Sequence, residues 1–586
     1  MSDISTAPDL AAVTAELIAP GAPFEMAERD VRGITLRTWK NAPPTLPDVL
    51  AASRAHGDAE FLVYDGEAPG AVSRPFDRLT FADHVASSAA FAHHLIDEVG
   101  IQVGDRVCIA MRNFPEWSIA FWGAAVAGAV VVPLNAWWTG PELAYGLADS
   151  GSRILVADPQ RAERVAEHQA ELPALERVLV ARAGSADLPD GAVSFESAVG
   201  PVDPDAALPD VELGPEDNAT IFYTSGTTGQ PKGALGTHRN ICTNLVSLGY
   251  CAARTSMRSV VPAGDSAPAG APARNVYLLS VPFFHATGCH SVLVANLAAG
   301  GEIVIMHRWD AERALQLIER ERVTVFGGVP AMVWQVLEHP DFASYDLSSV
   351  RAIGYGGAPA APELVRRLEA MFPGRIPSNG YGLTETSSVT TMNGGLDYRR
   401  KPDSVGVPVP VCDVQVVDGE GQPLPDGEVG ELWIKGPNVV TGYWNKPEAT
   451  AAAISDGWLH SGDIARVDEE GFVFIVDRAK DMIIRGGENV YCVEVEAALF
   501  EHPAVTDAAA IGIPHRVLGE EVGVVVHLAP GTSATEDELR SFAAERIAAF
   551  KVPVRIWFKD DPLPRNPNGK IMKRDLKAEL LPNVAP

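Results

Sequence analysis

The chain has 586 residues, of which 47 are basic and 76 acidic, so its formal net charge is −29. This length exceeds what one hydrophobic core supports, and we therefore expect several domains. A charge this negative argues against nucleic acid or an anionic membrane as the main partner. It also means that a polyphosphate ligand would need cationic side chains placed locally at its own site.

Six cysteines are scattered without a CxxC pair or metal-ligand spacing, which indicates reduced thiols rather than a disulfide framework. The N-terminus lacks the basic and apolar regions of a signal peptide. The most apolar run, 118–133, is shorter than the roughly 18 residues that a membrane span needs, and it ends in proline. We expect a cytoplasmic protein without a transmembrane segment.

From about residue 76 onward, short β-branched runs alternate with amphipathic segments. "RVCIAM" precedes the helix-like "PEWSIAFWGAAVAG", and "AVVVPLN" follows it. The pattern predicts further strands at "RILVAD", "RVLVA", "VYLLSVPF", "EIVIMH", "RVTVFGG" and "VRAIGYGG", and helices at 311–321 and 362–372. This alternation indicates an α/β architecture with largely parallel sheets.

The second half of the chain changes in character. The Pro/Ala/Gly-rich stretch 258–275 predicts an exposed insertion. After about residue 400, short strands separated by Gly, Pro and Asp turns predict a small β-rich subdomain. The last hundred residues predict a compact α+β unit, and charged residues near "IVDRAKDMIIRGGENV" suggest a boundary there.

The loop 224–233 in "YTSGTTGQPKG" follows an apolar run. Its glycines and hydroxyl residues suit phosphate oxygens, and Lys232 adds a positive charge. A P-loop would require Gly-Lys-Ser/Thr, whereas this lysine stands between proline and glycine. Alone, the loop is equally consistent with a turn that binds nothing. It is accompanied by "GYGGAP" (354–359), "NGYGLTET" (379–386), "WLHSGDIARVDEEGFVFIVDRAKDMIIRGGENVY" (458–491) and "LPRNPNGKIMKRDL" (563–576).

In this order and spacing, the five segments resemble those of the ANL superfamily of adenylate-forming enzymes, and most of all acyl-CoA synthetases. The resemblance extends from about residue 45 to 578. It implies that a carboxylate attacks ATP to give acyl-AMP and pyrophosphate, and that the CoA thiol then displaces AMP. ATP and CoA are the implied co-substrates and Mg²⁺ the implied cofactor. The implied division is an N-terminal extension (1–44), an AMP-binding region of two α/β subdomains and a β-rich one (45–478), and a mobile α+β C-terminal domain (479–586).

The resemblance also assigns roles at the nucleotide site. Glu385 and Thr228 would lie near the metal, Tyr381 against adenine, and Asp463 at the ribose hydroxyls. The implied catalytic residues are Lys570, which would neutralise charge between the carboxylate and the α-phosphate, with Glu385, His285 and Lys232. The implied ATP and AMP contacts are Thr224, Ser225, Gly226, Thr227, Thr228, Gly229, Lys232, Gly356, Gly357, Ala358, Asn379, Gly380, Tyr381, Gly382, Thr384, Glu385, Asp463, Arg478 and Lys570.

For the acyl and CoA sites, His285 matches a position that gates the acyl pocket. A hydrogen-bonded core histidine is an equal alternative. Lys480 matches the hinge about which the C-terminal domain would rotate. Cys492 stands where the family usually has proline, and Asn566 where it often has threonine. The implied acyl and CoA residues are His285, Phe283, Phe284, Gly288, Gly486, Gly487, Glu488 and Asn489.

This hypothesis has three alternatives. An amino-acid-activating domain would want an acidic residue near Phe284, and a luciferase-type enzyme a second lysine at the position of Ile484, so both are disfavoured. A non-catalytic nucleotide-binding protein that kept the fold stays open. We expect a medium- to long-chain fatty acid as the substrate, with aryl and sterol-side-chain acids as alternatives. A homodimer is compatible with the family.

Overall fold

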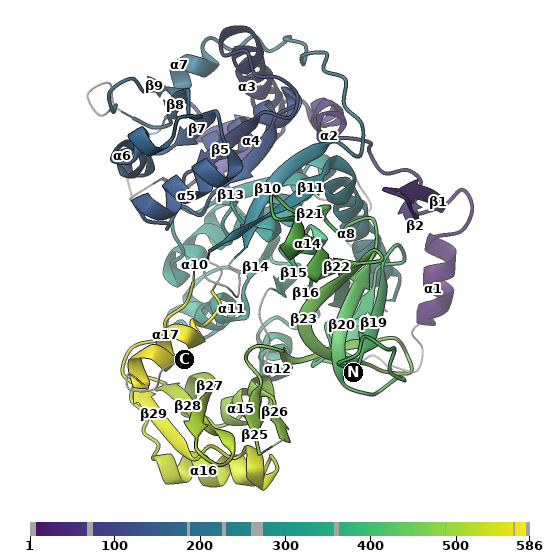
Figure 1. Cartoon of the computed structure of the whole chain (residues 1–586), viewed down its shortest axis with the longest axis vertical. Helices are drawn as coiled ribbons and strands as arrows, with labels where there is room; N and C mark the ends of the chain where they lie inside the picture. The colour runs from purple at the N-terminus through teal and green to yellow at the C-terminus, as the bar shows by residue number, and fades with distance from the viewer. Residues whose placement is uncertain are drawn as a thin grey trace.

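The computed structural model describes residues 8–66, 74–183, 188–224, 230–258, 274–356, 362–486, 488–566 and 569–581. The described chain forms two large sheets with helices, whose strands are interleaved in sequence, then a smaller sheet and a C-terminal unit (Figure 1). The predicted α/β architecture is confirmed. The predicted insertion at 258–275 falls outside the described residues except at its ends.

The first large sheet is eight-stranded, in the order β21-β11-β10-β6-β5-β7-β8-β9. It is parallel from β10 to β9, and β11 and β21 add an antiparallel edge. Its strands are β5 (Arg106–Ala110), β6 (Val130–Pro133), β7 (Ile154–Ala157), β8 (Arg177–Val180), β9 (Val193–Ser194), β10 (Asn218–Thr224), β11 (Lys232–Thr237) and β21 (Gly442–Tyr443). The helices in this part of the chain are α3 (Phe81–His93), α4 (Pro115–Val126), α5 (Gly140–Ser150), α6 (Pro159–Ala166) and α7 (Phe195–Val199).

The second large sheet is nine-stranded, in the order β18-β17-β16-β15-β14-β12-β13-β3-β4, and is parallel from β16 to β3. Its strands are β3 (Glu60–Tyr64), β4 (Arg78–Thr80), β12 (Val276–Leu279), β13 (Glu302–Ile305), β14 (Val325–Gly328), β15 (Ala352–Gly356), β16 (Ile376–Tyr381), β17 (Thr391–Gly394) and β18 (Val407–Pro408). Helices of this part are α2 (Leu46–Ser53), α8 (His238–Arg258), α9 (Ala295–Ala299), α10 (Ala311–Arg320), α11 (Pro330–Leu337), α12 (Pro362–Met371) and α13 (Leu396–Arg400), with a π-helical segment at Thr287–Val294.

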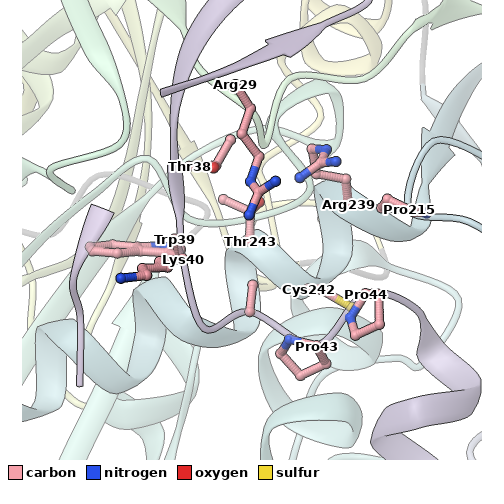
Figure 2. A pocket seen from close by; sticks show the side chains of 11 residues that line it. Arg29, Thr38, Trp39, Lys40, Pro43, Pro44, Pro215, Arg239, Cys242 and Thr243 are labelled. Carbon is pink, nitrogen blue, oxygen red and sulfur yellow. The ribbon is translucent and has the colours of Figure 1, made fainter. Parts of the chain in front are cut away.

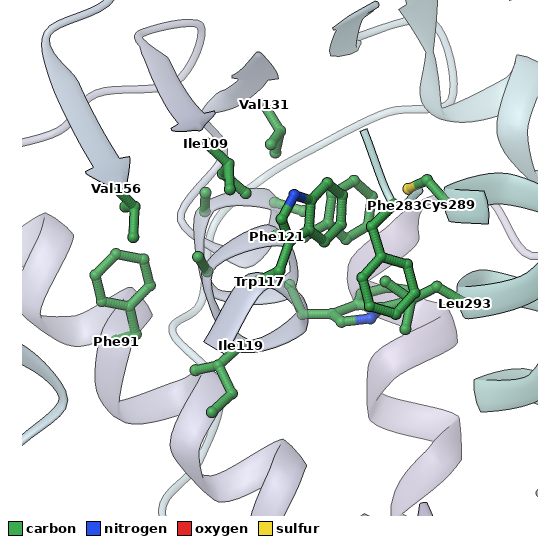
Figure 3. Close-up of a cluster of buried hydrophobic side chains, with 14 of the residues drawn as sticks. Phe91, Ile109, Trp117, Ile119, Phe121, Val131, Val156, Phe283, Cys289 and Leu293 are labelled. Atoms are coloured by element: carbon green, nitrogen blue, oxygen red, sulfur yellow. The ribbon is translucent and has the colours of Figure 1, made fainter. Parts of the chain in front are cut away.

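The main hydrophobic core lies around α4, whose residues are all buried. Trp117 on α4 stacks on Phe283, with ring centroids 5.1 Å apart (Figure 3). The apolar run 118–133 is therefore a buried helix followed by β6, and its lack of a polar face reflects burial on all sides. Among the described helices, none combines the length and the apolar character that crossing a bilayer requires.

Residues 479–482 connect the smaller sheet to the C-terminal unit. The smaller sheet holds β19 (Asp413–Val417), β20 (Gly430–Lys435), β22 (Ile454–Ser455), β23 (Trp458–Val467) and β24 (Val473–Arg478), with α14 (Pro447–Ala453) beside it. The C-terminal unit holds β25 (Ile483–Arg485), β26 (Glu488–Val490), β27 (Val505–His515), β28 (Gly519–Leu528), β29 (Arg555–Lys559), α15 (Cys492–Phe500), α16 (Glu536–Ala544) and α17 (Lys573–Leu580). At the other end of the chain lie α1 (Leu10–Leu17), β1 (Met26–Val31) and β2 (Ile34–Trp39).

Candidate active site

The two ends of the proposed phosphate loop are held together at the antiparallel edge of the first sheet. Thr224 ends β10 and pairs with Lys232, which begins β11. The hydroxyl of Tyr145 on α5 donates a hydrogen bond of 2.9 Å to the carbonyl of Pro231. The loop residues between them, among them the predicted Ser225, Gly226, Thr227, Thr228 and Gly229, lie outside the described residues.

Glu385 lies in a short helical turn after β16 and shares a neighbour with Lys232. The Glu385 Oε1 atom accepts a hydrogen bond of 2.8 Å from the Tyr443 hydroxyl. The Lys232 ammonium lies 5.3 Å from the centroid of the Tyr443 ring. Glu385 and Lys232, the two charged residues predicted for the phosphate site, thus both contact Tyr443. This tyrosine is not among the residues predicted from the sequence.

The surroundings of Glu385 suit a carboxylate that shares a magnesium ion with a ligand. No cluster of three or more His, Cys, Asp and Glu side chains that could hold a metal occurs among the described residues. Magnesium in nucleotide sites commonly takes one or two carboxylates and completes its shell with phosphate oxygens and water. Within the described part of the chain, Glu385 Oε2 accepts no hydrogen bond. A single carboxylate with one available oxygen fits a magnesium ion carried by a triphosphate.

Three predicted nucleotide residues meet where the end of β24 pairs with β23 in the smaller sheet. Asp463 on β23 pairs in register with Arg478 on β24. The Asp463 Oδ1 atom lies 2.7 Å from Arg478 Nε, and Oδ2 accepts a 2.7 Å hydrogen bond from the Tyr381 hydroxyl. Asp463 is only 1% exposed. Because a carboxylate has about four lone-pair sites, this one keeps acceptor capacity for a ligand.

Lys570 lies on a tight loop whose backbone is held by Asn566. The Asn566 Oδ1 atom accepts the Lys570 N–H at 3.0 Å, and the Asn566 N–H donates to the Lys570 carbonyl at 2.9 Å. A Cβ atom added to Gly569 would lie 2.3 Å from the side chain of Val329, so the loop contacts the start of α11. Asn566 stands where the family often has threonine, and the loop is nevertheless closed by hydrogen bonds.

The charges of residues predicted to bind the nucleotide act on the Lys570 ammonium. Burial, assisted by the positive charges of Arg478 and Lys480, lowers the pKa of Lys570 to about 8, against the opposing effect of Asp481 and Asp463. Because charges alter the pKa of a side chain only over short distances, Lys570 lies near both Asp463 and Arg478. The structure thus places Lys570, on the loop before α17, within electrostatic range of Asp463 and Arg478 on the smaller sheet.

The segment predicted for the CoA step does not lie at this cluster. Gly486, Glu488 and Asn489 are exposed in the hairpin of β25 and β26, and Gly487 lies outside the described residues. In Figure 1 this hairpin is on the right side of the C-terminal unit. Lys480, the predicted hinge, is exposed in the connection between β24 and β25.

Contacts cross this connection on both sides of Lys480. The Asp477 carboxylate on β24 accepts a hydrogen bond from the Cys492 N–H at the start of α15. The Cys492 thiol donates to the Asp481 carbonyl at 3.0 Å. Burial raises the pKa of the Cys492 thiol, so it stays protonated and able to donate. Cys492 thus secures the connection although it replaces the family's proline.

His285 is neutral at physiological pH. Its Nδ1 atom accepts a hydrogen bond from the Thr287 N–H at 3.3 Å, so Nε2 carries the proton. Burial lowers the pKa of His285 to about 4. Phe284 packs edge-on against the half-exposed Trp137, with centroids 5.4 Å apart, whereas Phe283 is fully buried against Trp117. This position gives Phe283 a packing role in the core.

Gly288 has a steric reason to be glycine. A Cβ atom there would lie 2.1 Å from the Pro282 carbonyl oxygen. We expect Gly288→Ala to destabilise the protein by about 1–3 kcal/mol, as overpacking in a core does, and to lower the melting temperature. Gly249→Ala on α8 is the matched control, because its Cβ would meet only Phe24, at 3.6 Å. A wild-type melting temperature for Gly288→Ala would contradict this prediction.

The remaining predicted nucleotide residues lie at the carboxyl ends of β15 and β16. Gly356 pairs with Gly380, and a Cβ on Gly356 would lie 2.5 Å from the Gly380 carbonyl oxygen. Ligands of open α/β sheets bind outside the carboxyl ends of the strands, so this edge suits a nucleotide. Asn379 is 6% exposed at the same edge. Gly382 and Thr384 follow in the turn before Glu385, and Gly357 and Ala358 lie outside the described residues.

A surface pocket of about 180 Å³ lies elsewhere, between the N-terminal segment and the start of α8. Figure 2 shows Arg29, Arg239 and Thr243 at its centre. Arg239 is ion-paired with Glu216. None of the predicted site residues lines this pocket, so it is separate from the candidate active site.

Comparisons with known proteins agree with this geometry. The AMP-binding enzyme family model matches residues 50–444, and that of the AMP-binding enzyme C-terminal domain matches residues 494–570. A feruloyl-CoA synthase from an Amycolatopsis species is 38% identical over 499 residues, which cover 85% of this chain and 93% of the relative. A long-chain-fatty-acid–CoA ligase of Bacillus subtilis is 34% identical over 529 residues, covering 86% and 91% of the two chains.

Solved structures give the same result. An anthranilate CoA ligase in complex with anthranoyl-AMP has a TM-score of 0.79 at 25% identity, covering 92% of this chain and 98% of its own. A fatty acyl CoA synthetase of Mycobacterium tuberculosis has a TM-score of 0.67 at 30% identity, covering 92% and 99%. The chain therefore belongs to the AMP-binding family of adenylate-forming enzymes, the ANL superfamily, and within it is acyl-CoA synthetase-like.

Proposed function

We propose that this acid–CoA ligase activates a medium- to long-chain fatty acid, first as acyl-AMP with release of pyrophosphate and then as acyl-CoA with release of AMP. The kind of reaction follows from the family and from the CoA ligases among its relatives. The observation that best supports the assignment of its residues is that Lys570, far along the chain, lies within electrostatic range of the ion pair of Asp463 and Arg478.

In the first step, Lys570 stands between two anions. The substrate carboxylate and the α-phosphate repel each other, and a nearby ammonium lowers the barrier to their approach. Asp463 accepts hydrogen bonds from the ribose hydroxyls with its remaining lone pairs. Lys232 and Glu385 act at the β- and γ-phosphates, where a magnesium ion, when bound, supplies further neutralisation of charge.

In the second step, the C-terminal domain (479–586) rotates about Lys480. Lys570 then withdraws from the acyl-AMP, and the Gly486–Asn489 hairpin moves to the CoA thiol. The exposed Gly486, Glu488 and Asn489 lie away from the Lys570 loop, which supports a second arrangement that brings them to the acyl-AMP. Element termini such as the end of β24 are common hinge positions.

An aryl acid with a hydroxyl group is the second candidate, and it is favoured by a polar cluster beside the predicted acyl residues. The His290 Nδ1–H donates to the Ser387 carbonyl at 3.1 Å, so Nε2 is an acceptor. His290 is 2% exposed, and neither its Nε2 nor the Ser387 hydroxyl has a hydrogen-bond partner among the described residues. A hydroxyl group on the acyl moiety could donate to this buried acceptor. The 38% identity to a feruloyl-CoA synthase supports the same candidate.

A panel of acids tests both candidates. Saturated acids from hexanoate to stearate are compared with ferulate, 4-coumarate and anthranilate, and pyrophosphate release is measured with and without CoA. We expect CoA-dependent turnover in which one class exceeds the other by about tenfold or more in kcat/KM. His290→Phe lowers turnover only if the hydroxylated aryl acids are the substrates. ATP binding without acid-dependent pyrophosphate release would instead identify a non-catalytic nucleotide-binding protein.

A further inference from the structure

Tyr443 lies next to the strand that follows the phosphate loop. It belongs to the short strand β21, which pairs antiparallel with β11 through Ala234 (Figure 1). The neighbouring Trp444 N–H donates to the Gly233 carbonyl at 2.8 Å. These backbone bonds fix the position of Tyr443 relative to Lys232, two residues before Ala234 on the same strand.

Tyr443 contacts both charged residues assigned to the triphosphate. Its hydroxyl donates to Glu385 Oε1 at 2.8 Å, and its ring faces the Lys232 ammonium at 5.3 Å from the centroid. The Val440 N–H donates to the Glu385 carbonyl at 2.9 Å, so the same segment also holds the Glu385 backbone. Few other residues could join an anion and a cation in this way, since an aromatic face attracts cations while a phenol donates to a carboxylate.

The Tyr443 hydroxyl is the donor in its bond to Glu385, because a phenol is protonated at neutral pH and a carboxylate can only accept. This hydrogen bond occupies Oε1 and leaves Oε2 without a protein partner among the described residues. Hydrogen bonds of this kind orient a metal-binding carboxylate, and their loss commonly costs 10- to 100-fold in metal affinity or activity.

We propose that Tyr443 is a positioning residue for Mg·ATP, orienting the Glu385 carboxylate through its hydroxyl and the Lys232 ammonium through its ring. This inference rests on the proposed function, because that function assigns Glu385 and Lys232 to the triphosphate. In this role Tyr443 acts on the triphosphate through Glu385 and Lys232, its two observed neighbours.

Two substitutions separate the contributions of the hydroxyl and the ring. Tyr443→Phe removes the hydroxyl and keeps the ring, whereas Tyr443→Leu removes both. The dissociation constant of α,β-methylene-ATP, which cannot be adenylated, is measured by calorimetry with magnesium and again with a chelator. We expect Tyr443→Phe to weaken magnesium-dependent binding by about 10- to 100-fold and to leave metal-free binding at the wild-type value. Tyr443→Leu should also weaken metal-free binding, by about two- to fivefold.

Kinetics provide a second readout. The magnesium concentration for half-maximal acid-dependent pyrophosphate release is expected to rise in Tyr443→Phe. Transfer of the acyl group from preformed acyl-AMP to CoA should keep its wild-type rate, because that step involves neither magnesium nor pyrophosphate. Tyr250→Phe is the control: it removes a tyrosine hydroxyl that hydrogen-bonds Thr14 at 3.0 Å, at the packing of α1 on α8.

Several outcomes would overturn the proposal. One is that magnesium strengthens the binding of α,β-methylene-ATP to Tyr443→Phe as much as it strengthens binding to the wild type. Another comes from the Glu385→Gln background, in which Tyr443→Phe should have no further effect on magnesium dependence. If the losses of magnesium dependence from Tyr443→Phe and Glu385→Gln were fully additive in the double variant, Tyr443 would act elsewhere than through Glu385. This holds whether or not either variant is less stable. Failure of the wild type to bind the analogue or to release pyrophosphate would refute the proposed function instead.

Discussion

Replacing Lys570 with alanine is expected to slow acyl-AMP formation by about 10²- to 10³-fold or more, while acyl transfer from preformed acyl-AMP to CoA keeps its wild-type rate. The selectivity arises because Lys570 lies within electrostatic range of Asp463 and Arg478 in the present arrangement, whereas the second step is assigned to the hairpin that carries the exposed Gly486, Glu488 and Asn489. Single-turnover measurements of each half-reaction, started from acid and ATP or from synthetic acyl-AMP, separate the two. Equal losses in both would contradict a two-arrangement mechanism.

The pH dependence of the first step follows from the same lysine. Burial and nearby positive charges lower the pKa of Lys570 to about 8, and the protonated form is the one that neutralises the two anions. Acyl-AMP formation should therefore be fast below this pKa and should fall as the pH rises through about 8. Lys570→Arg keeps a cation at high pH and should lose this inflection, even if its rate is lower. A wild-type profile that is flat between pH 7 and pH 9 would argue against Lys570 as the required cation.

Two of the charged residues that the sequence motifs single out are neighbours in the structure, and the reason is physical. Asp463 and Arg478 lie on consecutive strands, so a short motif contains both partners of a register pair. Lys570 lies far away along the chain, and only the resemblance to a family linked it to them. Its loop could not be judged from sequence, because the hydrogen bond from the Lys570 N–H to Asn566 depends on the backbone turn.

Other features could not be predicted from sequence at all. Tyr443 acquires its neighbours through the pairing of β21 with β11, and no local pattern marks a tyrosine that will meet a distant glutamate. Phe283 and Phe284 are adjacent in one apolar run, yet Phe283 is in the core and Phe284 contacts a half-exposed tryptophan. Periodicity shows that such residues are buried but does not show whether they line a core or a pocket.

Replacing Asp463 with alanine is expected to remove most of the affinity for the ribose of ATP. Its carboxylate is assigned to two ribose hydroxyls, and hydrogen bonds to a charged group contribute about 1.5–3 kcal/mol each. Their joint loss corresponds to about 10²- to 10⁴-fold in kcat/KM for ATP. The substitution also leaves the Tyr381 hydroxyl and Arg478 without their shared acceptor, so a lower melting temperature should accompany it.

Deoxynucleotides separate the loss of ligand contacts from the loss of stability. The wild type should use 2′-deoxy-ATP and 3′-deoxy-ATP less well than ATP, because each lacks one hydroxyl donor to Asp463. Asp463→Ala should use all three equally, since the acceptor that distinguishes them is gone. Tyr381→Phe is the matched variant: it removes a neighbour of Asp463 and should lower stability while keeping the discrimination. If Asp463→Ala still preferred ATP by the wild-type factor, the ribose would be bound by other groups, and Asp463 would serve mainly to hold Arg478 and Tyr381 in place.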